Sequence, residues 1–313
     1  MKTILQRTIK DKETNLYPVW LMRQAGRYMP EYMAIKEASN GFLDMALTPS
    51  KATEITMQPI KAFDMDAAII FSDILVIPYA LGQELDYNPA PKLGPYNEDM
   101  LNTDRFLFIE RCQPVYDAIK QTRQELDSNK SLIGFVGAPY TLCKYMCGNK
   151  DQKVIEGLVP YIIEHLVHQI EAGCDTVQIF DSWAGDLTEQ ELDKLCYSPT
   201  AKIVEAIRKI YPEVSIIAFP RLIGKNINDF AKIVNPDCIN LSDDIPVEEV
   251  STNVVLQGGI PISELLADAN PTSMLEKMKD KPYIVNLAHG VNKETPVENV
   301  RNFVQTVKDF RCN

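Results

Sequence analysis

Eight short apolar or β-branched runs recur along this 313-residue chain, and a segment with helical periodicity follows most of them. Such alternation is typical of repeated βα units. Eight strands that close on themselves form a (β/α)8 barrel, a fold that suits a chain of this length. The predicted strands are 18–22, 66–71, 132–136, 176–180, 215–219, 237–241, 253–257 and 283–287. We therefore expect residues 1–313 to form one α/β domain, a single (β/α)8 TIM barrel.

The segments between the strands agree with this interpretation. Apolar residues between Leu158 and Ala172 form a helical stripe that ends at Gly173, and 226–234 is a second predicted helix. The link between the sixth and seventh strands is so short that its helix must be a turn or two. A doubly wound sheet would need Gly-x-Gly-x-x-Gly after a strand, and the sequence lacks it, which also argues against a nucleotide cofactor.

Composition excludes some classes of partner. The chain has 32 Lys plus Arg against 43 Asp plus Glu, and its net charge of -11 argues against binding nucleic acid or anionic lipid. It has no apolar run of membrane-spanning length, and the N-terminal residues lack the apolar stretch of a signal peptide, so we expect a cytoplasmic protein. Seven scattered cysteines are typical of reduced thiols; Cys143 and Cys147 lack the further ligands of a zinc site, and we expect no metal.

Polar residues follow most of the predicted strands. In a barrel the active-site cleft lies at the C-terminal ends of the strands, so these are the candidate functional positions. An Asp or Ser there is as often only the cap of the next helix, and for Asp181 and Asp243 the two interpretations are equally good. The positions are Arg23, Arg27, Ser72, Asp73, Asp181, Ser182, Arg221, Asp243, Asp244, Gly258, Gly259, His289 and Gly290.

Asp73 differs from the other candidates because apolar residues flank it on both sides. A buried carboxylate needs donors, so Asp73 is either a functional group or the partner of an arginine in a structural ion pair. Arg23 and Arg27 are four residues apart, and on a helical turn they would share a face and clamp carboxylates. A solvent-exposed pair is the structural alternative.

His289 is the one histidine at a predicted strand end, and Gly290 beside it leaves room for close approach by ligand or backbone. His165 and His168 lie on a predicted helix, where we expect satisfied surface or core groups. Tyr145 either presents its hydroxyl or packs as an aromatic. These residues include neither a metal-binding set nor a nucleophile paired with a base, so they indicate an enzyme that acts on a polyanionic small molecule without a cofactor.

Several stretches resemble the uroporphyrinogen decarboxylase family. The most specific is Pro18-Val19-Trp20-Leu21-Met22-Arg23-Gln24-Ala25-Gly26-Arg27-Tyr28-Met29-Pro30-Glu31-Tyr32. Others are Gln58 to Pro78, which includes Phe71-Ser72-Asp73-Ile74-Leu75, and then Gly134 to Leu142, Phe180 to Gly185, and Asn286 to Gly290. The resemblance therefore spans essentially the whole chain.

The resemblance implies a homodimeric (β/α)8 barrel that converts uroporphyrinogen III to coproporphyrinogen III by removing four acetate carboxyl groups, with no metal or organic cofactor. It implies that Arg23 and Arg27 hold substrate carboxylates and that Asp73 accepts hydrogen bonds from pyrrole N–H groups and stabilises a cationic ring. Arg23 is our hypothesis for the proton donor. The remaining implied contacts are the backbone of Gln24, Ala25 and Gly26, the side chains of Tyr145, Ser182 and His289, and a peripheral contact from Lys36.

The sequence departs from the family pattern in three places. The stretch from Tyr145 to Leu158 is shorter than usual, Gly258-Gly259 follows Gln257, and Pro220-Arg221 follows the fifth strand. One rival function is a zinc-dependent corrinoid methyltransferase of the same superfamily, but His289 is followed by Gly290 and Val291 and not by the required cysteine. The other rival is a non-catalytic tetrapyrrole-binding protein, which the full set of polar residues disfavours.

Overall fold

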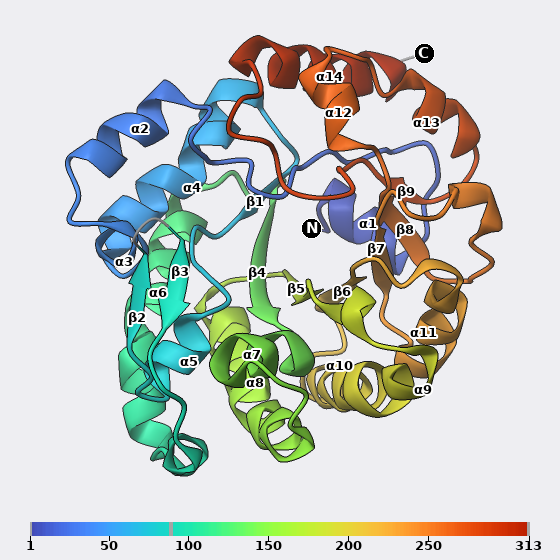
Figure 1. The fold of residues 1–313 in the computed structure, drawn as a ribbon. Helices are drawn as coiled ribbons and strands as arrows, with labels where there is room; N and C mark the ends of the chain where they lie inside the picture. The colour runs from blue at the N-terminus through green and yellow to red at the C-terminus, as the bar shows by residue number, and fades with distance from the viewer. Residues whose placement is uncertain (1, 88–89, 312–313) are drawn as a thin grey trace.

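A curled, fully parallel sheet of seven strands forms the centre of the molecule in the computed structural model, which describes residues 2–87 and 90–311 (Figure 1). Its strands follow chain order and their helices lie outside, so the architecture is that of repeated βα units. The strands, in order across the sheet, are β1 (Ala67–Ile69), β4 (Ser131–Gly137), β5 (Thr176–Asp181), β6 (Ser215–Pro220), β7 (Cys238–Leu241), β8 (Val255–Gly258) and β9 (Tyr283–Ile284).

Seven of the eight predicted strands are confirmed, each within a few residues of its expected bounds. The prediction was wrong for 18–22, which is not a strand and takes part only in an isolated parallel bridge between Val19 and Val285. Hydrogen bonds nevertheless hold this segment between β9 and β1. The Val285 amide donates to the Pro18 carbonyl at 2.9 Å, and the Asp66 amide donates to the Val19 carbonyl at 2.9 Å. A continuous ladder cannot form because the chain turns away at Met22 and Arg23.

Helices surround the sheet on its outer face. The α-helices are α1 (Ile4–Lys10), α2 (Pro30–Glu37), α3 (Phe42–Ala46), α4 (Pro49–Phe63), α5 (Val76–Ala80), α6 (Arg105–Glu125), α7 (Pro139–Cys147), α8 (Gln152–Ala172), α9 (Glu189–Leu192), α10 (Ser198–Ile210), α11 (Ile227–Val234), α12 (Ile262–Leu266), α13 (Thr272–Lys277) and α14 (Val297–Arg311). Shorter turns are η1 (Glu98–Asn102), η2 (Ala184–Asp186), η3 (Asp193–Tyr197), η4 (Gly224–Asn226) and η5 (Val247–Glu249). None of the helices described is long and apolar enough to cross a membrane.

The long helix α8 illustrates how local sequence sets an element. It begins at Gln152, earlier than the apolar stripe predicts, because the Asp151 side chain accepts hydrogen bonds from the Lys153 and Val154 amides and caps the first turn. It ends before Gly173, whose φ of 128° lies in the region that favours glycine. The other expected helix, α11, and the single turn η5 between β7 and β8 also match their predictions.

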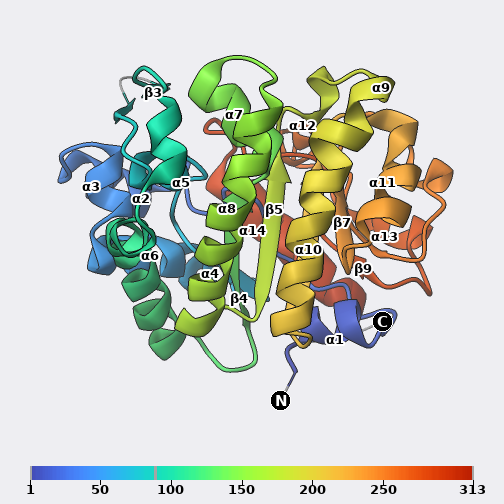
Figure 2. The ribbon, with the colours of Figure 1, turned by 90° about the horizontal axis from the view of Figure 1, so that it is seen from below.

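The two ends of the sheet differ in character. At the N-terminal end, Leu5 and Ile9 of α1 are buried in a core cluster with Trp20, Ile133 and other residues of the sheet interior. At the C-terminal end of the strands lie α7, α9 and an antiparallel hairpin of β2 (Leu85–Tyr87) and β3 (Pro91–Leu93), which the strand pattern did not predict (Figure 2). Both chain ends lie on the opposite side (Figure 2).

The interior of the sheet also holds a buried polar network. The Trp20 indole donates to Gln257 at 3.0 Å, and Gln257 donates to Gln178 at 3.1 Å and to Asn240 at 2.8 Å. These groups are fully or almost fully buried, so the hydrogen bonds compensate for lost hydration. The network ties segment 18–22 to three strands and so helps to fix the start of the candidate site.

Candidate active site

A cavity of about 850 Å³ opens at the C-terminal ends of the strands, where the sequence predicted the active site. Its lining includes nine of the ten predicted substrate-binding residues: Arg23, Gln24, Ala25, Gly26, Arg27, Lys36, Asp73, Ser182 and His289. The tenth, Tyr145, is not among the lining residues. Its ring packs edge-on against Trp183, with centroids 6.0 Å apart, which matches the packed-aromatic alternative. Segments far apart in the sequence thus meet at one cavity.

Arg23 and Arg27 reach this cavity from turns and not from a helix, which corrects the expectation of a shared helical face. Arg23 has a φ of 57°, a left-handed conformation that cannot continue a right-handed helix, and α2 begins only at Pro30. The Gln24 side chain fixes this turn, because it accepts from the Leu21 amide and donates to the Ala67 carbonyl at 3.3 Å each. The Gln24 side chain therefore forms its hydrogen bonds within the protein.

Gly290 lines the cavity, where a ligand could approach it, and it also makes room for an arginine side chain. A methyl group on its Cα would lie 2.5 Å from Arg23 Cδ and 2.7 Å from Arg23 Cγ. The Arg23 side chain therefore crosses over Gly290 on its way into the cavity. The loop after β9 and the turn after Met22 are also joined by a hydrogen bond of 2.9 Å from the Val291 amide to the Met22 carbonyl.

Three of the cations that line the cleft have no carboxylate partner among the described residues, whereas a fourth, Lys293, pairs with Glu294. Within residues 2–87 and 90–311, Arg23, Arg27 and Lys36 form no ion pair with a carboxylate. All three side chains are exposed at the cavity. Unpaired guanidinium groups offer planar, two-pronged donors that fit carboxylates. The arrangement suits a ligand that carries several carboxylates.

Asp73 is a carboxylate in the same cavity, and it forms no ion pair with any other residue that the structure describes. One of its oxygens accepts a hydrogen bond of 2.8 Å from the Leu75 amide in the same loop. Burial raises the pKa of Asp73, while the Leu75 amide, the Tyr87 hydroxyl and the charge of Arg23 act to lower it. A ligand that brings N–H donors or positive charge would favour the ionised form.

The charges of two arginines affect the pKa of His289 more than the charge of any acid does. Burial lowers its pKa to about 4, and the neighbouring charges of Arg23 and Arg221 lower it further, whereas Asp243 opposes them. The imidazole is therefore neutral near pH 7. A neutral imidazole both donates and accepts hydrogen bonds, so His289 suits a polar contact with a ligand better than a permanent positive charge.

An aromatic wall, formed by Tyr32, Phe42, Phe71 and Tyr87, lines one side of the cavity. The Phe42 ring lies 4.5 Å from Tyr87 and 5.3 Å from Phe71, and Tyr32 meets Phe71 edge-on at 5.9 Å. The sequence did not predict that Phe42 and Tyr87 line the site, because α3 and the hairpin lie outside the βα repeat. The alternation in Leu85-Asp86-Tyr87 is a strand signal, but three residues are too few to identify it.

Asp181 lies behind the cavity and not in it. Its carboxylate accepts a 2.6 Å hydrogen bond from the Thr141 hydroxyl, and that hydroxyl accepts from the Trp183 amide at 3.2 Å. Burial raises the pKa of Asp181 to about 6. This arrangement joins the start of α7 to the loop after β5, and so it positions Ser182 at the cavity. Asp181 is neither a cleft residue nor a simple helix cap.

The thiols and the acids do not assemble a metal site in the described part of the chain. No group of three His, Cys, Asp or Glu there is placed to hold a metal ion. Six cysteines are free thiols, and the seventh, Cys312, lies outside the described residues. The Cys143 thiol donates to the Asp151 carbonyl at 3.5 Å, which ties the end of α7 to the start of α8.

Comparison with known proteins gives results for both sequence and fold. Residues 2–310 match the family model for uroporphyrinogen decarboxylase. The chain is 38% identical to uroporphyrinogen decarboxylase of Rickettsia rickettsii (strain Sheila Smith), with 93% of this chain and 92% of the relative covered. It is 33% identical to that of Erythrobacter litoralis (strain HTCC2594), with 99% and 100% covered.

Among solved structures, a methyltransferase from Methanosarcina mazei matches with a TM-score of 0.77 at 18% identity, covering 99% of each chain. A B12-independent methionine synthase from Shewanella sp. W3-18-1 matches with a TM-score of 0.55 at 12% identity, covering 83% of this chain and 88% of that one. At such low identity these two matches describe the fold alone.

Proposed function

This chain belongs to the uroporphyrinogen decarboxylase family, and on that premise we propose that its cavity removes the four acetate carboxyl groups of uroporphyrinogen III to give coproporphyrinogen III and CO₂. One observation carries the proposal. A single cavity holds unpaired cations together with one carboxylate, Asp73. A ligand that is polyanionic at its edge and rich in N–H groups at its centre complements both.

Binding follows from the charges at the cavity. Arg23, Arg27 and the more peripheral Lys36 bind substrate carboxylates, since no protein carboxylate competes for them among the described residues. Ser182 and the neutral His289 add polar contacts, and the backbone of Gln24, Ala25 and Gly26 approaches the substrate. Tyr145, which packs against Trp183, contributes from outside the cavity lining. Asp73 accepts hydrogen bonds from the pyrrole N–H groups.

Decarboxylation needs an electron sink. Protonation of a pyrrole α-carbon creates a cationic ring that accepts the electron pair of the breaking C–C bond. CO₂ leaves, the exocyclic carbon takes up a proton to become a methyl group, and the α-carbon then loses its added proton, which restores the aromatic pyrrole. Asp73 stabilises the cation electrostatically. Arg23 is the proposed proton donor, and because an isolated guanidinium is a weak acid, it acts within an ion pair with the substrate carboxylate.

The rest of the architecture follows the family premise. Segment 18–22 takes the place of the eighth strand in a closed (β/α)8 barrel. Its hydrogen bonds to Val285, directly after β9, and to Asp66 support this arrangement. Residues 1–313 act as one catalytic domain. The homodimer stays a prediction that rests on the family resemblance, and the cytoplasmic location stays a prediction from the sequence.

The activity is tested by an anaerobic assay of the purified protein with uroporphyrinogen III, no added metal and chelator present, followed by chromatography of the oxidised products. We expect a four-carboxyl product. Failure of folded protein that still binds the porphyrinogen to form any product would contradict the proposal and favour a non-catalytic binding protein. Activity that chelator abolishes would point to the zinc-dependent alternative.

The role of Asp73 is tested in the same assay with Asp73→Asn, which keeps the side-chain shape but removes the charge. Because the charge acts mainly on the cationic intermediate, we expect kcat to fall by about 100-fold or more while KM changes little. The control is Asp243→Asn, which removes an exposed carboxylate at the same end of the sheet but outside the cavity lining. Near-normal turnover of Asp73→Asn would refute the electrostatic role.

A further inference from the structure

Tyr87 reaches the cleft from an element outside the seven-stranded sheet. It is the last residue of β2 and pairs across the hairpin with Pro91, and both residues line the cavity. Side chains alternate along a strand, so Tyr87 shares the inward face with Leu85, which packs against the core, while Asp86 between them is exposed. The Phe42 ring holds the tyrosine ring within the aromatic wall.

The hydroxyl of Tyr87 has no other structural explanation. Its oxygen is buried and forms no hydrogen bond with any described residue. A buried hydroxyl without a partner is costly, so a tyrosine at this position requires an acceptor within reach. Asp73 is the one carboxylate among the residues that line the cavity together with Tyr87, and it is therefore the candidate acceptor. Burial raises the pKa of Asp73 and the Tyr87 hydroxyl lowers it, while burial and then Asp73 raise the pKa of Tyr87.

The surroundings of the pair leave Asp73 with few other donors. Its first oxygen accepts a hydrogen bond from the Leu75 amide, and its second oxygen accepts none from the described residues. Among the described residues, Arg23 is the one charged side chain that changes the pKa of Asp73. Besides Asp73, Tyr145 of α7 is the one titratable group among them that changes the pKa of Tyr87. The second oxygen of Asp73 is therefore available to Tyr87 and to the substrate.

We propose that Tyr87 is a positioning residue for the decarboxylation, whose hydroxyl donates to the Asp73 carboxylate and keeps it ionised and aimed at the pyrrole rings. The inference deepens the proposed function and rests on it for the substrate. Asp73 must be buried to stabilise a cationic ring strongly, but burial favours its protonated form. Asp73 must nevertheless be ionised before the cationic ring forms. A neutral donor resolves the conflict without cancelling the negative charge.

The test separates this inference from the proposed function because it measures the carboxyl group itself in the ligand-free protein. Asp73 is titrated by ¹³C NMR of protein labelled at the aspartate carboxyl carbon, and its signal is identified by its loss in Asp73→Asn. Tyr87→Phe keeps the ring and its contact with Phe42 but removes the hydroxyl. We expect the Asp73 midpoint to rise by about one pH unit, the size typical of a hydrogen bond to a charged group.

The matched control is Tyr96→Phe, which removes another buried hydroxyl without a partner, from a residue outside the cavity lining. It should leave the Asp73 midpoint unchanged. Replacing Tyr87 by 3,5-difluorotyrosine keeps the ring and the hydroxyl but makes the hydroxyl a stronger donor. This variant should lower the Asp73 midpoint. An Asp73 midpoint that neither change at position 87 moves, or that Tyr96→Phe moves equally, would overturn the inference whether or not the protein proves to be a decarboxylase.

Activity provides the second readout. In an active enzyme, Tyr87→Phe should shift the acid limb of kcat/KM to higher pH in parallel with the titration and lower kcat several-fold on that limb, with partial recovery at higher pH. A purely structural role would instead lower the unfolding temperature and reduce activity equally at all pH values. That second pattern would count against the positioning role.

Discussion

Gly290 decides where the guanidinium of Arg23 can lie. The side chain of Arg23 passes so close to the Gly290 Cα that a methyl group there would lie 2.5 Å from Arg23 Cδ. The φ of Gly290 is not in the left-handed region, so an alanine would not strain the backbone itself. The effect of a substitution would therefore be carried almost entirely by Arg23, whose own φ of 57° leaves its backbone little freedom to adjust.

We expect Gly290→Ala to displace Arg23 and lower kcat/KM about tenfold, the cost of weakening one charge-assisted hydrogen bond to substrate. Thermal unfolding should change little. The control is a double-mutant cycle with Arg23→Ala. If Gly290→Ala acts through Arg23, adding it to Arg23→Ala should cause no further loss. Independent, multiplying losses in the double variant would contradict this explanation.

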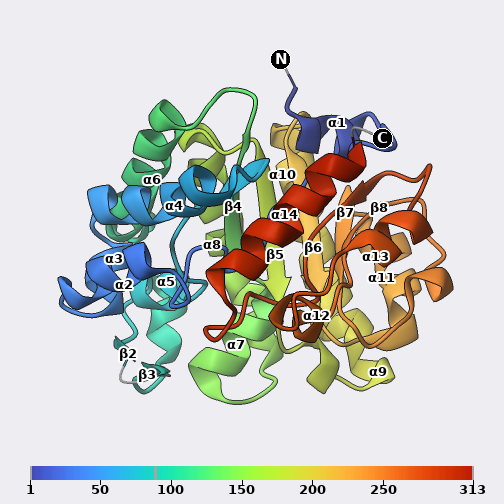
Figure 3. The same cartoon turned by 90° about the horizontal axis from the view of Figure 1, so that it is seen from above.

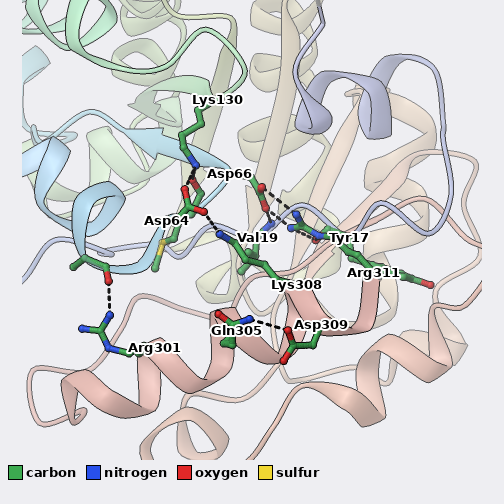
Figure 4. Close-up of polar contacts among 12 residues, drawn as sticks. Tyr17, Val19, Asp64, Asp66, Lys130, Arg301, Gln305, Lys308, Asp309 and Arg311 are labelled. Atoms are coloured by element: carbon green, nitrogen blue, oxygen red, sulfur yellow. Dashed lines mark hydrogen bonds and ion pairs between the residues drawn. The ribbon is translucent and has the colours of Figure 1, made fainter. Parts of the chain in front are cut away.

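At the scale of elements, segment 18–22 is held in place by a carboxylate and the C-terminal helix. Asp66 accepts from the Val19 amide at 2.7 Å and forms an ion pair with Arg311 of α14 (Figure 4). Arg311 also donates to the Tyr17 carbonyl at 2.7 Å. Helix α14 crosses the outside of the molecule, and its C-terminal end lies near α1 (Figure 3). The end of the chain thus stabilises the segment from which Arg23 extends.

Asp66→Asn should destabilise the protein by about 2 kcal/mol, because it removes the charge that compensates the mostly buried Arg311. Unfolding in urea measures this. Glu156→Gln is the control, because it breaks an ion pair with Lys202 in which the two side chains are 37% and 50% exposed. It should cost less than about 1 kcal/mol. Equal costs would show that Asp66 has no special role in holding 18–22.

At the scale of the whole molecule, tertiary packing gives two buried groups opposite effects on stability. Burial lowers the pKa of His165 to about 3, and its ring nitrogen bonds the Tyr116 hydroxyl at 2.9 Å. The unfolded chain binds this proton more readily, so His165 makes stability increase as pH rises from about 3 to 6.5. Burial raises the pKa of Asp181 to about 6, so the folded chain binds that proton more readily and stability decreases from about pH 4 to 6.

Asp181→Asn should therefore change the pH dependence of stability and not only its level. An amide does not titrate, so the stability of the variant does not decrease between about pH 4 and 6 as that of the wild type does. The free energy of unfolding of the variant, relative to that of the wild type, should therefore rise by roughly 1–3 kcal/mol across this range. Urea unfolding of both proteins at pH 4, 5, 6 and 7 measures the difference. A difference that is constant with pH would mean that Asp181 does not retain its proton in the folded state.

The sequence by itself determined the βα repeat, because the alternation of apolar runs and helical stripes reports which faces each element buries. It also determined the end of the sheet at which Arg23, Asp73 and His289 would collect, since parallel strands all end on the same side. Only the tertiary structure decided which polar residues meet. It showed that 18–22 forms a bridge and not a strand, because its neighbours hold it by contacts distant in sequence. It likewise revealed the place of Tyr87 beside Asp73, because the position of a short hairpin depends on packing against α3 and not on its own residues.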